Sequence, residues 1–118
     1  MHSRFLSFLC AFITTTSYAV SFDCTKASTS VEKMICTDPM LSRLDDALAE
    51  NYKSMLLSDF GGSKAELRNE QRIWLSKRNK CKDKACLVDA YRVRVDETCD
   101  YGVVSGIHPV CTSSEEIK

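Results

Sequence analysis

The sequence predicts an all-α protein: a small helical bundle stapled by disulfides, with two long antiparallel helices, shorter flanking helices and an irregular C-terminal arm. Apolar residues recur at three- and four-residue spacing, and no strand-like alternation occurs before residue 100. The 118 residues include 7 Cys but only 4 Gly and 2 Pro. A chain this short forms one small domain, which excludes multidomain catalytic architectures. Its 16 basic and 16 acidic side chains balance, so we expect no nucleic-acid binding.

The first 19 residues have the pattern of a signal peptide. Arg4 supplies a positive start, and residues 5–13 form an apolar run that is too short to cross a bilayer, which needs about 20 residues. Ser17 and Ala19 place small residues at the −3 and −1 positions of a cleavage site after Ala19. We therefore expect export to the periplasm or secretion, with no membrane insertion after the signal is cleaved.

Cleavage removes one cysteine and leaves a single domain at residues 20–118. Cys10 follows Leu9 inside the apolar run, whereas a lipidated Cys follows a small residue at its end, so we expect no lipid there. Six cysteines remain: Cys24, Cys36, Cys81, Cys86, Cys99 and Cys111. An even count in a small exported domain predicts three disulfides. A zinc site on Cys81 and Cys86 is disfavoured, because such a site needs four ligands and only one His lies nearby. We therefore expect no metal, and we expect no other cofactor.

The first two helices are predicted from their start signals. Thr29 and Glu32 match a capping box, which opens a short helix running through Cys36. Asp38 caps the next helix, and Pro39 at the first helical position loses nothing by lacking an N–H. The apolar stripe of this second helix is Leu41, Leu44, Leu48, Tyr52 and Met55.

Two further helices follow the stop at Gly61-Gly62. Ser63 and Glu66 match a second capping box. One face of the helix that follows is lined by Leu67, Gln71, Trp74, Leu75 and Arg78. After a polar corner at residues 79–83, residues 85–96 form a fourth helix. The side chains that it buries are predicted to be Leu87, Tyr91 and Val95.

The two long helices joined across the glycines should be antiparallel neighbours. The start of one then lies beside the end of the other, which brings four cysteines to one end of the bundle. We predict the bridges Cys24–Cys86 and Cys36–Cys81. The opposite pairing, Cys24–Cys81 with Cys36–Cys86, is the alternative. Each bridge would contribute about 2–4 kcal/mol to a domain this small.

Residues 98–118 differ in composition from the helical core at 24–97. They hold two of the four Gly and one of the two Pro, and we interpret them as an irregular arm closed by Cys99–Cys111. The last seven residues are expected to fray. The closed stretch between the two cysteines is preorganised for binding. It supplies the candidate partner-binding residues Val104, Ser105, Gly106, Ile107 and His108.

Catalytic constellations are not apparent, and we expect no enzyme. The mature chain holds one His, in the predicted loop, and contains no nucleophile-elbow, phosphate-loop or zinc-protease motif. Cysteines in disulfides are poor nucleophiles. Four polar residues on or beside the helix stripes are interpreted as a structural hydrogen-bond and ion-pair network: Asp45, Gln71, Arg78 and Arg94.

Five segments within residues 22–97 carry a distinctive pattern. They are Phe22-Asp23-Cys24, Thr29-x-x-Glu32-x-x-Ile35-Cys36, Leu41-x-x-Leu44-Asp45-x-x-Leu48-x-x-x-Tyr52, Leu67-x-x-x-Gln71-x-x-Trp74-x-x-x-Arg78-x-x-Cys81 and Cys86-Leu87-x-x-x-Tyr91-x-x-Arg94. This pattern resembles the LprI-type lysozyme-inhibitor domain. The resemblance implies a small exported helical domain and, through the best-known member of the family, inhibition of lysozyme. The predicted arm lies outside the pattern.

We therefore expect an exported module whose partner is a protein, a lysozyme, and which inhibits it by steric blockage. Contact is expected through residues 104–108, or, for a cationic lysozyme, through the acidic side of the helix at 38–59. The alternative is a non-inhibitory envelope protein that binds cell-wall polymer or another envelope protein. A hydrolase of envelope polymer is disfavoured by the missing catalytic groups.

Overall fold

The computed structural model describes residues 21–58, 63–101 and 110–118. Within these ranges the helices are α1 (Ser30–Thr37), α2 (Pro39–Leu57), α3 (Lys64–Arg78) and α4 (Lys84–Cys99), with short 3-10 turns η1 (Cys24–Lys26) and η2 (Ser114–Glu116). The predicted all-α fold class is confirmed. The expected signal peptide at 1–19 and the candidate residues 104–108 lie outside the described residues. None of the described helices is long and apolar enough to cross a membrane.

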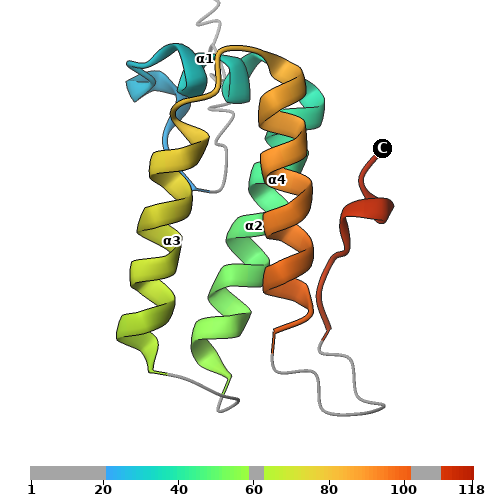
Figure 1. The fold of residues 1–118 in the computed structure, drawn as a ribbon. Coiled ribbons are helices and arrows are strands. Elements are labelled where there is room, and N and C mark those ends of the chain that lie inside the picture. The colour runs from blue at the N-terminus through green and yellow to red at the C-terminus, as the bar shows by residue number, and fades with distance from the viewer. Residues whose placement is uncertain (1–20, 59–62, 102–109) are drawn as a thin grey trace, which may run out of the picture.

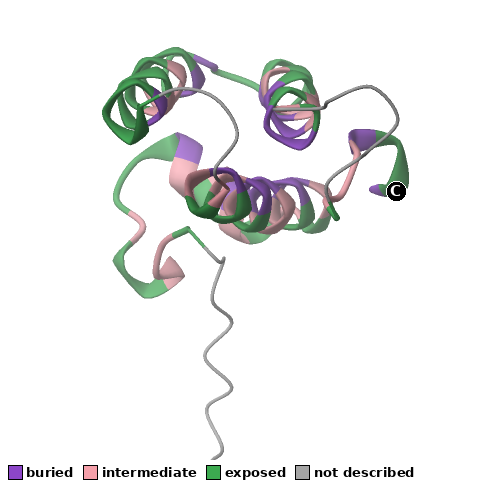
Figure 2. Ribbon diagram, turned by 90° about the horizontal axis from the view of Figure 1, so that it is seen from below, coloured by how far each residue is buried: buried purple, intermediate pink, exposed green. Residues whose placement is uncertain are grey.

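The bundle is built on α2, which α1 and α4 both cover. The helices α2 and α3 run antiparallel, as predicted, but they make little direct contact with each other, and α4 returns parallel to α2 (Figure 1). The most extensive interface joins α2 to α4, whereas α3 packs against α4 over a smaller surface. The buried faces of α2, α3 and α4 point toward a common centre (Figure 2). The core therefore depends more on the interface between α2 and α4 than on contacts with α3.

The helices begin where their capping residues stand. Thr29 Oγ1 accepts a hydrogen bond from the Glu32 backbone N–H at 3.1 Å, and the Glu32 carboxylate accepts from the Thr29 backbone N–H at 3.2 Å. Ser63 and Glu66 form the equivalent box on α3. The fourth helix is longer than the predicted 85–96, since it continues to Cys99. It begins at Lys84 because Asp83 caps it by accepting from the Cys86 N–H at 2.8 Å.

The cap of α1 should make folding sensitive to acid. Hydrogen bonds from the backbone N–H groups of Ser28 and Thr29 hold the pKa of Glu32 below its ordinary value of 4.5. The stability that they contribute is present above pH 4.5 and is lost as the pH falls through the lowered pKa. We expect Glu32→Gln to make the free energy of unfolding less dependent on pH in acid. The difference from wild type should stay below about 1 kcal/mol, because solvent screens the carboxylate. Chemical denaturation between pH 2 and 7 measures it, with the exposed Glu70→Gln as control. Equal acid slopes for wild type and Glu32→Gln contradict this prediction.

The core follows the predicted stripes closely. Of the α2 stripe, four members are buried and Tyr52 is half-buried. The three predicted core residues of α4 are all fully buried. Alongside them lie Val31 and Ile35 of α1, and Ile117 from the C-terminal arm. Burial of each such aliphatic side chain contributes about 1.5–3 kcal/mol relative to exposure.

Two of the three predicted disulfides are wrong. Cys24 pairs with Cys36, and Cys81 pairs with Cys86. Neither the predicted Cys24–Cys86 and Cys36–Cys81 nor the alternative Cys24–Cys81 and Cys36–Cys86 forms. The third prediction, Cys99–Cys111, is confirmed.

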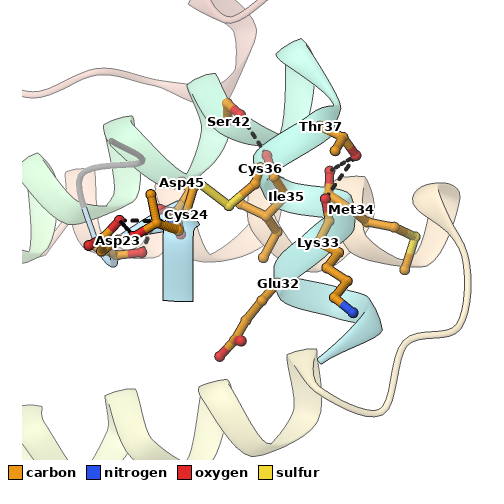
Figure 3. The surroundings of a disulfide bond; sticks show 12 residues. Asp23, Cys24, Glu32, Lys33, Met34, Ile35, Cys36, Thr37, Ser42 and Asp45 are labelled. Carbon is orange, nitrogen blue, oxygen red and sulfur yellow. Dashed lines mark hydrogen bonds between the residues drawn. A yellow bond between two sulfur atoms is a disulfide. The ribbon is translucent and has the colours of Figure 1, made fainter. Parts of the chain in front are cut away.

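The correct pairs are local because two short segments fold back on themselves. The turn η1 folds onto the end of α1, which leaves the Cα atoms of Cys24 and Cys36 5.8 Å apart (Figure 3). The corner before α4 is tight enough to bring the Cα atoms of Cys81 and Cys86 to 5.6 Å. An ion pair of 2.7 Å between Lys84 and Asp38 joins α4 to the start of α2 at this end.

Candidate functional site

The C-terminal arm is fastened to the bundle by a buried amide on α2. The Asn51 side chain, 2% exposed, donates hydrogen bonds to the backbone oxygens of Val95 at 3.2 Å and Thr112 at 2.8 Å. Its Oδ1 accepts from the Thr112 N–H at 3.1 Å. One side chain thus joins α2, α4 and the arm. Sequence reasoning missed Asn51, although it lies three residues after Leu48 and four before Met55, on the buried stripe.

A second set of contacts holds the end of the arm on α4. The Asp96 carboxylate accepts from the backbone N–H and the hydroxyl of Ser114, both at 2.7 Å. The Arg92 guanidinium donates to the backbone oxygens of Ser114 at 2.7 Å and Ile117 at 3.3 Å. Ser114 and Ile117 are buried. The prediction that the last seven residues fray is therefore wrong, because these contacts dock them on the bundle.

The candidate partner-binding residues lie between two fixed points. They fall in residues 102–109, outside the described part of the chain. Before them, Cys99 is buried at the end of α4, and after them Cys111 precedes the docked Thr112. The disulfide holds the two Cα atoms 5.3 Å apart. Whatever this segment contacts, its two ends are held by the helical core.

The predicted polar network is present as two separate groups. In the first, the Tyr91 hydroxyl of α4 donates to Asp45 of α2 at 2.7 Å, and Arg78 of α3 donates to the same hydroxyl at 3.2 Å. The Ser21 hydroxyl donates to the second oxygen of Asp45. Burial raises the pKa of Tyr91, and the adjacent Asp45 carboxylate raises it further, so the phenol stays protonated at neutral pH. This group joins three helices.

The second group joins α3 to α4. Arg94 donates through Nε to Gln71 at 3.0 Å and through Nη1 to Glu97 at 3.2 Å. Trp74 packs edge-on against Tyr91, with ring centroids 5.1 Å apart. Tyr91 is the network member that sequence reasoning missed, because a tyrosine on a buried stripe is predicted as packing alone.

The acidic side of α2 carries less free charge than the sequence indicates. Asp38 is engaged in its ion pair with Lys84, and Asp45 is buried in the network. Asp46 and Glu50 lie in a shallow hollow that also holds two basic residues, Arg43 and Lys118. Opposite charges are therefore mixed on this surface.

The described residues have the features of a small, disulfide-stabilised helical protein. They form a helical domain stapled by three disulfides, whose polar network ties helices together, and they contain no group of three or more His, Cys, Asp or Glu placed to hold a metal ion. The chain belongs to the lysozyme inhibitor LprI family, whose model matches residues 24–115. This match extends beyond the 22–97 pattern and includes the Cys99–Cys111 arm.

Known relatives agree with this assignment at low identity. The chain is 29% identical over 96 residues to proteins named "Lipoprotein LprI" from Mycobacterium bovis and Mycobacterium tuberculosis. The alignment covers 78% of this chain and 47% of each relative, so the chain spans about half the length of the curated relatives it matches. No solved structure matches the chain.

Proposed function

We propose that this chain is an exported inhibitor that binds a lysozyme and blocks its substrate cleft sterically. Membership of the lysozyme inhibitor LprI family supports the activity. Three disulfides support export, since such bonds persist in oxidising compartments. The observation that carries the proposal is the double anchorage of the arm, by the Cys99–Cys111 bridge and by Asn51.

In this proposal the contact is made by residues 104–108. Binding a protein cleft costs conformational entropy for every residue that becomes ordered, and restraint before binding lowers that cost. The arm is restrained by the Cys99–Cys111 bridge on one side and by the docked stretch from Thr112 to Ile117 on the other. Ser105 and Gly106 would present a hydroxyl and bare backbone to the carboxylates of a lysozyme cleft.

The proposal includes binding without catalysis. Buried Asp45 and Arg78 both hydrogen-bond to Tyr91 of a neighbouring helix, which suits a scaffold. Export is assigned to the signal sequence at residues 1–19, with the mature protein in the periplasm or secreted. Although the mycobacterial relatives are named lipoproteins, we assign no lipid to Cys10, since it stands inside the apolar run.

Cell-wall lysis in the presence of this protein tests the function. Oxidised protein, residues 20–118, is titrated into lysis assays with hen-type, goose-type and invertebrate-type lysozymes, beside a reduced and alkylated control. We expect saturable inhibition of one class that is lost on reduction. Failure to inhibit any class at large molar excess overturns the proposal. Binding to peptidoglycan in that case would favour the envelope-protein alternative.

Substitutions in the arm locate the contact. We expect Ser105→Trp and His108→Ala each to weaken inhibition by about tenfold or more, because the segment enters the cleft in our proposal. The matched control is Lys80→Ala, an exposed change at the opposite end of the bundle. If both arm variants inhibit fully while Glu50→Lys and added salt weaken inhibition, the contact lies on α2 instead.

A further inference from the structure

One end of the bundle carries an excess of positive charge. Residues 23–38 and 76–84 form this end, since η1, α1, the start of α2 and the corner between α3 and α4 lie together there (Figure 1). The two stretches hold seven basic and four acidic side chains, a net charge of +3. At the opposite end, residues 52–57, 64–70 and 94–100 hold four basic and five acidic side chains. We call the positive end the lysine end.

The four carboxylates of the lysine end are turned toward helix starts. Each accepts hydrogen bonds from backbone N–H groups in or beside the first turn of a helix: Asp23, Glu32, Asp38 and Asp83. The N–H groups of a helix start carry partial positive charge, so these carboxylates offset the helix ends rather than the lysines. Only Lys84 has an acidic ion-pair partner at this end among the described residues, and that partner is Asp38.

The remaining cations are available at the surface. Arg78 is buried in the polar network. The other cations of this end are exposed and have no ion-pair partner in the part of the chain that the structure describes: Lys26, Lys33, Lys77, Lys80 and Lys82. They come from η1, α1, the last turn of α3 and the corner that follows it. The positive charge is therefore spread over the whole end of the bundle.

The residue types indicate what kind of anion this surface fits. All five free cations are lysines, whose ammonium is a compact hydrated charge without the fork that lets arginine clamp one fixed phosphate or carboxylate. Residues 23–38 and 76–84 contain no Phe, Tyr or Trp on which a nucleic-acid base could stack. The large exposed apolar residues of the described chain lie elsewhere, so nothing at this end would enter a hydrocarbon layer. Binding through charge alone to many mobile anionic groups suits such a surface.

We propose that the lysine end adsorbs to the anionic phospholipid headgroups of a membrane surface. Lipids diffuse within a planar layer, so an anionic headgroup can gather beneath each of the spread lysines. Each lysine near an anionic membrane contributes about fivefold to the affinity. The Cys99–Cys111 bridge lies at the other end of α4, and adsorption would direct it away from the membrane (Figure 1). Adsorption does not depend on the proposed function. Where both hold, the inhibitor is kept at the membrane with its arm outward.

Cosedimentation with lipid vesicles tests the proposal. Oxidised protein, residues 20–118, is mixed with phosphatidylcholine vesicles that contain about a third phosphatidylglycerol, and with pure phosphatidylcholine vesicles. We expect saturable binding to the anionic vesicles alone at about 20 mM salt, and its loss at about 0.5 M salt because the charges are then screened. Lys33→Gln/Lys80→Gln/Lys82→Gln should weaken binding by about tenfold or more, since three ammonium contacts are lost.

A matched variant removes the same charge from the opposite end. Lys53→Gln/Lys64→Gln/Arg68→Gln changes three exposed residues and should keep vesicle binding within about twofold of wild type. Circular dichroism checks that both triple variants are folded. Equal weakening by the two variants would show that net charge governs binding, which overturns the assignment to the lysine end. Failure to bind anionic vesicles, or binding to soluble polyphosphate without binding to vesicles, overturns the membrane surface as the partner. Lysozyme takes no part in this assay, so either failure leaves the proposed function standing.

Discussion

Tyr91→Phe is expected to lower the free energy of unfolding by about 2–4 kcal/mol. The hydroxyl that it removes is the donor to Asp45 and the acceptor for Arg78. These two charged residues are only 2% and 6% exposed, so the lost bonds are poorly replaced by water. Loss of one partner from a buried charged group costs more than the bond itself contributes. Urea denaturation followed by far-ultraviolet circular dichroism measures the change.

A matched control separates the network from the aromatic ring. Tyr52→Phe removes a hydroxyl from a half-buried tyrosine of the α2 stripe that has no hydrogen-bond partner among the described residues, and should cost less than about 0.5 kcal/mol. A double-mutant cycle of Tyr91→Phe with Asp45→Asn should show a coupling of about 0.5–3 kcal/mol. Equal, small effects of the two Tyr→Phe changes would falsify the assignment of Tyr91 as the centre of the network.

The helices could be predicted because their signals are local. Asp38-Pro39 and the box at Ser63 specify helix starts from residues that are adjacent in the chain, and the structure places the starts there. The stripe of α2 specifies which face is buried, since apolar spacing alone defines it. The cap at Asp83 is equally local, but it lies in the run of polar residues 79–83, and the sequence does not mark which of them begins the helix.

The disulfide pairing could not be predicted from helix order alone. Helix topology brings four cysteines to one end of the bundle, but the choice among partners depends on how tightly η1 and the corner before α4 fold back. Those turns are set by local hydrogen bonds, such as the Asp23 carboxylate accepting from the Thr25 N–H at 2.9 Å. Bridges between neighbours in sequence close small loops, which require little chain entropy.

The candidate site was only partly visible in the sequence. The composition of the arm and its two cysteines marked it as a separate feature, but its docking depends on tertiary contacts such as Asp96 with Ser114. Asn51 was hidden for the same reason, since nothing near it in sequence shows its partner at Thr112.

Removal of the arm disulfide should have a large effect on both stability and inhibition. Cys99 and Cys111 are 12 residues apart in sequence, and constraint of a loop this long stabilises the folded state by about 3 kcal/mol in the chain-entropy model. We expect Cys99→Ala/Cys111→Ala to lose about this much, measured by urea denaturation. Inhibition should fall by about tenfold or more at temperatures where the variant stays folded, since the hydrogen bonds to Asn51, Asp96 and Arg92 then hold only the part of the arm from Thr112 onward.

The bridge at the opposite end of the bundle provides the control for this loss. Cys81 and Cys86 are 5 residues apart, so Cys81→Ala/Cys86→Ala should cost about 2 kcal/mol by the same model. The stability losses of the two double variants are thus comparable, while the two bridges lie at opposite ends of α4. If inhibition depends on a restrained arm, only the Cys99–Cys111 variant loses it beyond what its unfolded fraction explains. Equal losses in both variants would show that general destabilisation, rather than restraint of the arm, governs binding.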